Sequence, residues 1–303
     1  MISKYSFNNI TWVDLQSPTP EEVSHLVEEF SLPTLMAEEF ISETVRSKVD
    51  LYKDLIFLVL HFPVNRHLKN YKTEQEIDFV IGKNFLITIH YELINPLHEF
   101  SKKFEMDALL DKHNVGNHAG HLFYSVIKQL YKNVITELDT INPDLKKIEH
   151  NIFEGREKET VKTISNLNRH LLSYRQSLRF HYETLKSFES VGKKFFDPEF
   201  AFYLESIISE YNKIKNILDN EKDVLTDLRE TNDSLLSSKT NETMRILTIM
   251  TFIIAPATLL ASIFMMNTEF PLIRTFVEFY MILGGMFLTS IATFIFFKLK
   301  KWL

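Results

Sequence analysis

The 303-residue sequence contains no cysteine, which excludes a disulfide framework, a thiolate metal site and a thiol nucleophile. Its seven glycines form neither a Gly-rich phosphate-binding loop nor the sharp turn that presents a catalytic serine. No catalytic set of side chains is recognisable, so we expect no enzyme and no cofactor. The net charge of −6, without a basic stripe, argues against nucleic acid as a partner. The N-terminal residues lack an apolar segment, so we expect no signal peptide.

Two long apolar runs are the most prominent feature that is present. Residues 246–267 carry no charged side chain, and residues 279–297 are also apolar. About 20 apolar residues cross a bilayer core of roughly 30 Å, so the sequence predicts a two-helix hairpin in a lipid bilayer. Basic residues flank its soluble side, at Lys239, Arg245, Lys298, Lys300 and Lys301. By the positive-inside rule both termini are expected in the cytoplasm, with the protein in the cell (inner) membrane.

Residues 1–114 predict a cytosolic α/β domain. Thr19 is placed to cap a helix that begins at Pro20 and runs to about Phe30. Further helices are expected after Pro33 and over residues 95–110. Strands are expected over residues 9–13, 55–61, 75–81 and 85–90. This pattern is typical of a small sheet with helices packed on it.

From His121 onward the pattern is helical almost to the end. One helix is expected to reach Phe153 with a kink at Pro143, and a second to run from Arg156 to about Val191. Asp197 is placed to cap a third helix that begins at Pro198 and continues to Met265. That helix would be on the order of 100 Å long, and its mixed surface needs partners, either the two preceding helices or copies of itself.

A stripe of mostly small or polar side chains follows one side of the first span. Its members recur at spacings of three and four residues and lie within an arc of roughly 100° on a helix. They are Asn241, Met244, Thr248, Thr251, Ala255, Thr258 and Ser262. From the periodicity, a water-lined pore wall and close packing of small residues between helices both remain open.

Asn267 ends the first span. A single Asn there is commonly a helix end in contact with lipid headgroups. In an oligomer it would instead form a ring of amides whose carbonyls accept hydrogen bonds from the water shell of a cation. Such a ring suits Mg²⁺, which loses its water reluctantly.

The eleven histidines and the acids of the long helix give weaker signals. His118 and His121 share a helix face, yet their spacing matches no metal motif, so solvated or capping roles are expected. His61 and His90 lie in predicted strands, where hydrogen-bonded core or edge roles are expected. The acids of the long helix are expected to form a solvated face.

Several segments together resemble the CorA family of divalent-cation channels, and the resemblance extends over the whole chain. Trp12-Val13-Asp14-Leu15, followed by the Pro-Thr-Pro-Glu-Glu segment at 18–22, is similar to the start of that family's cytosolic domain. Residues 155–161 lie where the family's paired helices meet. The most specific similarity covers residues 239–249, then Pro256 and the terminal Lys-Lys-Trp-Leu at 300–303.

The resemblance implies a homopentamer that carries divalent cations, most readily Mg²⁺, which would be both the transported and the regulatory ion. The long helices would line a funnel and then the pore, with the second spans as an outer ring. Met244 and Leu247 would form a hydrophobic constriction on the cytosolic side, and Glu230 an acidic position in the funnel. Glu205 is a candidate ligand for a regulatory ion. The further positions that match the pore wall are Asn241, Thr251, Ala255, Thr258 and Asn267.

The outer mouth departs from the family's Gly-Met-Asn signature, because Met265 and Met266 precede Asn267 here. A Cβ penalises a left-handed backbone and crowds a close approach, so the replacement of Gly bears on ion choice. Glu269 remains in the following loop and would give a ring of carboxylates that concentrates cations. Transport of Zn²⁺, Co²⁺ or Ni²⁺, and a non-conducting membrane-tethered metal sensor or scaffold, therefore stay open as alternatives.

These observations predict a mostly α-helical membrane protein whose long stalk helix continues into the first transmembrane helix. The expected parts are the α/β domain at 1–114, an antiparallel helical pair at 115–196, the stalk at 197–245, the pore helix at 246–267, an outer loop at 268–278, the second transmembrane helix at 279–297 and a basic tail at 298–303.

Overall fold

The computed structural model describes residues 2–7, 9–64, 74–109, 116–265, 276–300 and 302. The chain divides into two compact units. The first contains residues 1–154 and 159–229, and the second contains residues 155–158 and 230–303. The long helix α8 (Ala201–Met265) runs from the first unit into the second as one element.

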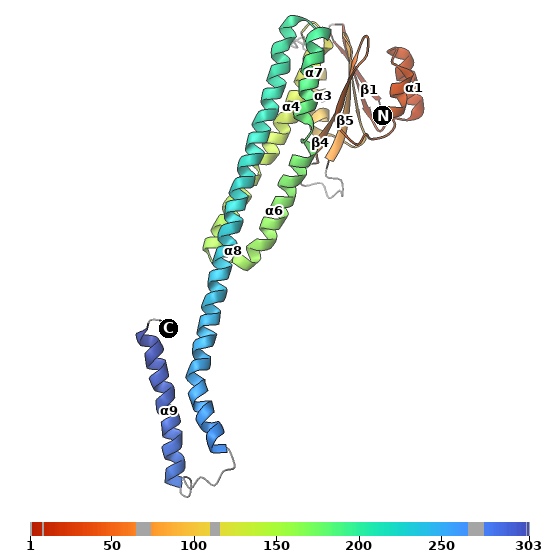
Figure 1. Ribbon diagram of the computed structural model, residues 1–303. Coiled ribbons are helices and arrows are strands. Elements are labelled where there is room, and N and C mark those ends of the chain that lie inside the picture. The colour runs from red at the N-terminus through yellow and green to blue at the C-terminus, as the bar shows by residue number, and fades with distance from the viewer. Residues whose placement is uncertain are drawn as a thin grey trace. The chain divides into compact units, whose positions relative to one another are not determined.

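The first unit is built on a six-stranded sheet with the order β1-β2-β6-β5-β4-β3. Figure 1 shows this sheet beside the helices of the unit. The strands are β1 (Ile2–Phe7), β2 (Ile10–Gln16), β3 (Lys48–Leu51), β4 (Ile56–Pro63), β5 (Glu74–Ile81) and β6 (Phe85–His90). β2 and β6 are parallel, with Trp12 opposite Leu86, and the other neighbours are antiparallel. The expected sheet is present, and β1 and β3 at its two edges were not predicted.

One face of the sheet is covered by α1 (Pro20–Glu29) and α2 (Thr34–Glu39). Alternate residues of the strands point to this face, and Val13, Val59 and Val80 pack there against Leu26 and Met36. Thr19 caps α1 as predicted, in a capping box with Glu22. This layer fixes the two central strands from one side.

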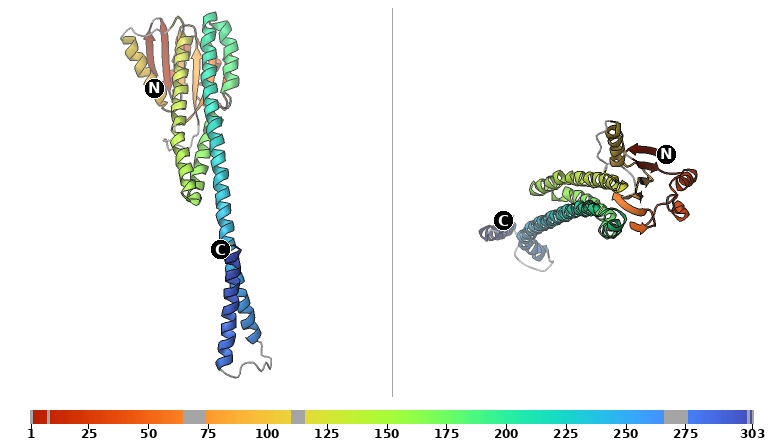
Figure 2. Two further views of the ribbon diagram at one scale, coloured as in Figure 1. Left: turned by 90° about the vertical axis from the view of Figure 1, so that its left-hand side faces the viewer. Right: turned by 90° about the horizontal axis from the view of Figure 1, so that it is seen from above.

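The opposite face is covered by α3 (Asn95–Leu109), α4 (Ala119–Asp139) and α7 (His181–Phe195), and Figures 1 and 2 show these helices across the sheet from α1. Trp12 is fully buried and packs edge-on against Phe104 of α3, with ring centroids 5.7 Å apart. Phe79 of β5 contacts Phe123 of α4, with ring centroids 5.2 Å apart. The core of the soluble unit therefore lies on both sides of the sheet.

The two predicted helices between residues 121 and 191 are each divided. α4 ends at Asp139 and α5 (Ile141–Phe153) begins after Thr140, so the break lies upstream of Pro143. Pro143 lies in the first turn of α5, where its missing N–H is tolerated. α6 (Glu157–Ser177) and α7 are separated by residues 178–180, and α7 continues past Gly192 to Phe195. No Gly or Pro marks that second break, which is why the sequence did not reveal it.

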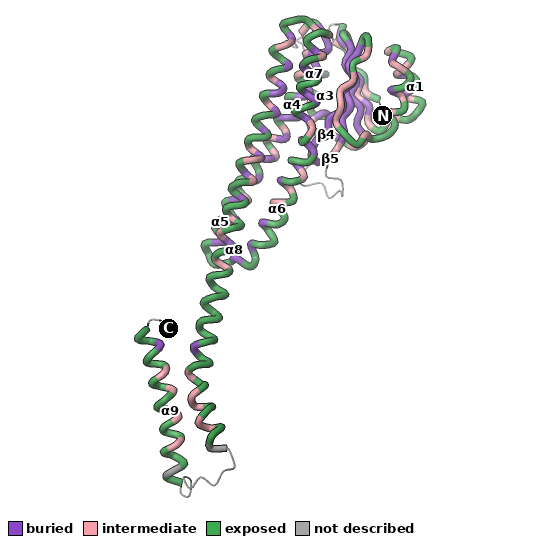
Figure 3. The backbone as a smooth tube through the Cα atoms, in the orientation of Figure 1, coloured by how far each residue is buried: buried purple, intermediate pink, exposed green. Residues whose placement is uncertain are grey.

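The long helix begins as predicted. Asp197 accepts a hydrogen bond from the backbone N–H of Phe200 at 2.9 Å, and a short 3₁₀ turn, η1 (Pro198–Phe200), leads into α8. Glu221 and Leu225 are buried on α8, while the segment from Ser237 to Ile263 contains one buried residue, Ile249 (Figure 3). Among the residues that the structure describes, two helices, α8 and α9 (Phe276–Leu299), are long and apolar enough to cross a membrane. In the most apolar segment of α8, 6% of the residues are buried, and in that of α9 none are. These two segments are therefore not part of a soluble hydrophobic core.

Candidate ion pathway

The predicted polar stripe lies on the second half of α8, and all of its side chains are exposed. Met244 and Leu247 are 56% and 57% exposed. Asn241, Thr248, Thr251, Ala255, Thr258 and Ser262 are exposed as well. The stripe is thus an exposed surface that the rest of the described chain does not cover.

The hydroxyl groups of the stripe are oriented by the helix itself. Thr248 donates to the carbonyl of Met244 at 2.7 Å, and Thr251 donates to that of Leu247 at 3.0 Å. Thr258 and Ser262 donate to the carbonyls of Ile254 and Thr258 at 3.1 and 2.9 Å. Because each hydroxyl hydrogen is used within the helix, the oxygen lone pairs face outward as acceptors. A row of acceptors suits a cation or its water shell.

Pro256 lies inside α8, which continues beyond it for nine residues to Met265. Its ring lacks the N–H that would reach the carbonyl of Phe252, and this loss permits a bend in the membrane segment. The lost hydrogen bond belongs to the turn between Phe252 and Pro256, which contains Ala255 of the stripe.

The predicted outer mouth lies mostly beyond the part of the chain that the structure describes. Met265 is the last residue of α8. Met266, Asn267 and Glu269 fall outside the described residues. Their roles remain predictions from the sequence.

The two predicted acidic positions of the stalk differ in their surroundings. Glu230 is exposed on α8, on the same side of the helix as the stripe when successive residues are placed 100° apart. Glu205 is also exposed and lies 3.4 Å from the ammonium group of Lys193. Among the described residues, no group of three or more His, Asp or Glu side chains is arranged to hold a metal ion. A regulatory ion at Glu205 would need ligands from elsewhere.

The sequence did not predict the buried carboxyl groups of Glu76, Asp78 and Glu221. Glu221 of α8 is 2% exposed, and neither of its oxygens has a hydrogen-bond partner among the described residues. Burial, followed by the charge of Asp139, raises its pKa to about 7. Asp78 of β5 is fully buried beside Glu76, and burial followed by the charge of Glu76 raises the pKa of Asp78 well above its ordinary value. The alternation of β5 places these two acids on the same face, and the sequence could not show that the strand is covered on both sides.

A polar contact joins the start of α6 to the long helix within the second unit. The ammonium group of Lys239 donates to the carbonyl of Gly155 at 3.1 Å and to the carboxylate of Glu157 at 2.7 Å. This hydrogen bond lowers the pKa of the Glu157 carboxyl group. Gly155 has a φ of 80°, a conformation that a residue with a Cβ adopts only with strain. The two segments that resemble the CorA family, residues 155–161 and 239–249, therefore contact each other.

The histidines singled out in the sequence have structural surroundings. The Nδ1 atom of His118 accepts a hydrogen bond from the N–H of Gly120 and so caps α4, as expected. Its ring packs on His121, with centroids 4.3 Å apart. His61 is hydrogen-bonded to Ser47 and to the carbonyl of Thr44, and His90 to the carbonyl of Glu92. A metal role for these side chains has no support from their arrangement.

The fold and the exposed apolar helices together define a membrane protein with an α/β soluble domain. The family described as "CorA-like Mg2+ transporter protein" matches residues 7–300. The chain therefore belongs to the CorA-like Mg²⁺ transporter family.

Individual relatives are similar over nearly the whole chain. The cobalt/magnesium transport protein CorA of Thermotoga maritima is 26% identical over 299 residues, which cover 97% of this chain and 83% of the relative. The magnesium transport protein CorA of Campylobacter jejuni (strain RM1221) is 24% identical over 314 residues, which cover 97% of this chain and 92% of the relative. The solved CorA magnesium transporter of Methanocaldococcus jannaschii superposes with a TM-score of 0.84 at 19% identity, over 99% of this chain and 94% of that one. This likeness supports the predicted fold class.

Proposed function

We propose that the protein is a homopentameric channel for divalent cations, with Mg²⁺ as its principal ion. Membership of the CorA-like family supports the class of transported ion, since relatives that match almost the full chain are magnesium or cobalt/magnesium transport proteins. The observation that carries the pathway is the exposed stripe of α8, whose hydroxyl oxygens face outward as acceptors. Five copies with this stripe toward a common axis would line a polar pore.

The outer mouth is proposed to select the ion. Asn267 of each subunit would contribute to a ring of amide oxygens, and Glu269 to a ring of carboxylates that attracts cations before they enter. Amide oxygens accept hydrogen bonds from coordinated water, so an ion that keeps its water shell is recognised without dehydration. Met265 and Met266 would shape the approach to this ring.

The cytosolic end of the pore is proposed to be the gate. Met244 on the stripe and Leu247 at its edge are large apolar side chains, and rings of such side chains close a narrow pore by excluding water. Glu230 would hold cations in the funnel beyond this constriction. Binding of cytosolic metal, with Glu205 as one candidate ligand, would favour the closed state.

The ion is proposed to move inward through the cell membrane, with both termini in the cytoplasm. A divalent cation gains about 4.6 kcal/mol for each 100 mV of inside-negative potential. The stalk at 197–245 would lead to the pore helix at 246–267, and the second helix at 279–297 would lie outside it.

A flux assay on the full chain in proteoliposomes tests the proposal. A potassium gradient with valinomycin sets the potential, and uptake of Mg²⁺, Co²⁺, Ni²⁺ and Zn²⁺ is measured in turn. We expect Mg²⁺ uptake that increases with inside-negative potential and that Asn267→Ala reduces at least tenfold. Zn²⁺ uptake in preference to Mg²⁺ would reassign the ion, and no uptake of any of the four by a verified pentamer would refute the channel.

Met265 motivates one second candidate, a non-conducting metal sensor or scaffold with the same fold. The Met265→Gly variant restores the signature residue and separates the two functions. Equal uptake by wild type and variant supports the channel, whereas uptake by the variant alone supports the sensor or scaffold. Met266→Gly, one residue along, is the matched control.

A further inference from the structure

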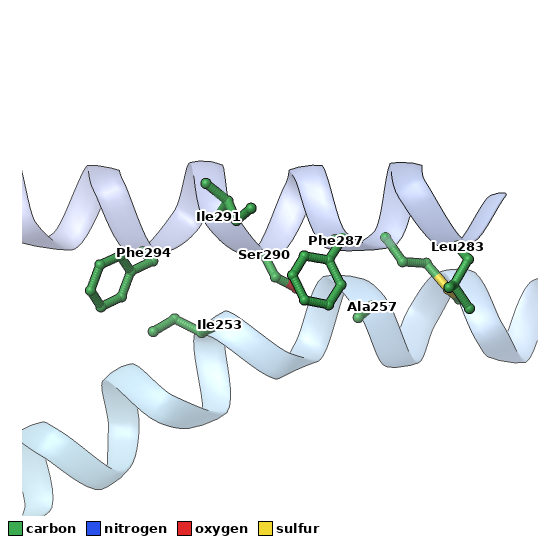
Figure 4. A pocket seen from close by; sticks show the side chains of 8 residues that line it. Ile253, Ala257, Leu283, Phe287, Ser290, Ile291 and Phe294 are labelled. Atoms are coloured by element: carbon green, nitrogen blue, oxygen red, sulfur yellow. The ribbon is translucent and has the colours of Figure 1, made fainter. Parts of the chain in front are cut away.

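An apolar groove of about 490 Å³ runs between α8 and α9 in the second unit (Figure 4). Ile253 and Ala257 line it from α8, and Leu283, Phe287, Ser290 and Phe294 are among the residues that line it from α9. The hydroxyl of Ser290 is the one polar side-chain group in this lining, and the methyl group of Ala257 fills little of the space between the helices. A bilayer contains no water to fill such a groove, so hydrocarbon must cover it.

The groove lies on the side of α8 away from the polar stripe. At 100° per residue, Ile253 and Ala257 are each rotated by roughly 200° from the stripe residues two positions before them, Thr251 and Ala255. If the stripe faces the axis of a ring, as proposed above, the groove faces outward. Its natural occupant is then a lipid and not the pore wall of a neighbouring subunit.

Aromatic contacts and then basic residues follow Phe294, the last residue of α9 in the groove lining. Phe252 and Phe297 approach with ring centroids 6.1 Å apart, and Trp302 packs on Phe297 at 5.9 Å. Lys298 and Lys300 are exposed immediately after Phe297. Arg245 is also exposed, two helical turns before Phe252. Cationic side chains beside a groove between membrane helices, on the side facing the cytoplasm, suit an anionic headgroup.

We propose that this groove binds an anionic phospholipid, with an acyl chain between α8 and α9 and the phosphate group at Lys298 and Lys300. The apolar lining accounts for the chain and the flanking ammonium groups for the charge. Aromatic side chains at this level match the belt in which such rings contact the boundary between hydrocarbon and headgroups. The bound lipid would fill the space between the two helices and hold them at a fixed separation.

Lipid retention by the purified full-length protein tests the proposal. The protein is exchanged into detergent with phosphatidylglycerol or phosphatidylcholine, and the lipid that remains after washing is counted by native mass spectrometry, which also reports the number of subunits. We expect phosphatidylglycerol to be retained at least fivefold better than phosphatidylcholine. Retention of neither, or equal retention of both, would overturn the proposal.

Two groove-filling variants, Ala257→Trp and Ser290→Trp, provide the structural test. Each should reduce retention of phosphatidylglycerol at least tenfold, whereas Leu288→Trp, an equally bulky change on α9 outside the groove lining, should retain it. The double variant Lys298→Gln/Lys300→Gln should lose the preference for phosphatidylglycerol. It should retain phosphatidylglycerol and phosphatidylcholine in equal amounts.

Three results would contradict the assignment. Undiminished retention of phosphatidylglycerol in both Ala257→Trp and Ser290→Trp would show that the lipid binds elsewhere. Loss of the oligomer in both, with Leu288→Trp intact, would show that another subunit occupies the groove. An unchanged lipid preference in the lysine variant would show that Lys298 and Lys300 do not bind the headgroup. Since ion flux is not measured, failure of the proposed channel would leave these readouts unaffected.

Discussion

The two halves of α8 have the same backbone and opposite surroundings. In the first half, buried side chains recur at spacings of three, four or seven residues and pack within the soluble unit: Leu204, Ile207, Tyr211, Ile214, Leu218 and Leu225. In the second half, apolar side chains such as Met250, Phe252 and Ile254 are 55 to 61% exposed. A helix this long is not stable on propensity alone, so each half needs partners. The first half finds its partners in its own chain, and in the proposed channel the bilayer and other copies would supply those of the second half.

This difference predicts that changes in the first half alter folding of the soluble unit, while changes in the second alter transport. Trp12 is fully buried in the sheet, and the only other tryptophan is Trp302. Replacing Trp302 by Phe makes Trp12 fluorescence a specific reporter of the soluble unit. The variants below are compared in that background.

The largest effect is expected from a cavity in the first half. Ile214 is fully buried, so Ile214→Ala should lower the free energy of unfolding by about 2–5 kcal/mol. The matched change Ile254→Ala, at a position 61% exposed, should alter the Trp12 transition by less than about 0.5 kcal/mol. Urea titration in detergent measures both, and equal shifts would show that the two halves do not differ as described.

Glu221 is the exception within the buried half, and its replacement should stabilise the protein in a pH-dependent way. Its pKa is raised to about 7, so folding loses stability as pH rises from the unfolded value near 4.5 to 7. The loss is about 1.4 kcal/mol per pH unit, or about 3 kcal/mol in all. Glu221→Gln should remove this loss at pH 8 and change little at pH 4. The exposed Asp223→Asn is the control, and a gain independent of pH would contradict this account.

His181 should produce the opposite pH dependence in the same unit. It is fully buried between the hydroxyl of Tyr131 at 2.8 Å and the carbonyl of His61 at 2.7 Å, and burial lowers its pKa to about 3. Since the unfolded chain binds a proton near pH 6.5, stability should fall by about 1.4 kcal/mol per unit below that pH. His181→Gln should flatten this slope between pH 6.5 and 4 in the Trp12 assay. An unchanged slope would assign acid sensitivity to other groups.

The smallest effect on stability and a clear effect on flux are expected from Thr251→Val. The change is nearly isosteric, removes an outward acceptor and leaves the helix intact, so stability should change by less than about 0.5 kcal/mol. Uptake of Mg²⁺ should fall several-fold in proteoliposomes. Thr243→Val removes a hydroxyl that also donates to its own helix, but outside the stripe, and should leave uptake unchanged. Equal losses in the two variants would argue against a pathway along the stripe.

Local signals in the sequence predicted much of this architecture. The caps at Thr19 and Asp197 were predicted because each places an oxygen acceptor before a Pro-initiated helix. The length of α8 was predicted because no Gly or Pro occurs between Pro198 and Pro256. The edge strand β3 was missed because it has only four residues, and the break between α6 and α7 because its cause is tertiary packing.

Most features of the candidate site that the sequence did not predict depend on contacts between residues far apart in the chain. Lys239 contacts Gly155 and Glu157, which lie 84 and 82 positions away in the sequence. The burial of Glu221 depends on neighbours that periodicity cannot reveal. Asn267 and Glu269 lie outside the described residues, so their roles remain predictions.

The continuity of α8 has a mechanical consequence. The helix contains no glycine, and its first proline is Pro256. On the order of 80 Å separates Ala201 from Ala255 at 1.5 Å per residue. A rod of that length acts as a lever, since a tilt of about 3° at one end displaces the other by about 4 Å, comparable with the width of a side chain. In the proposed channel, small rearrangements among the soluble helices would be amplified by such a helix into displacements comparable with the size of an ion.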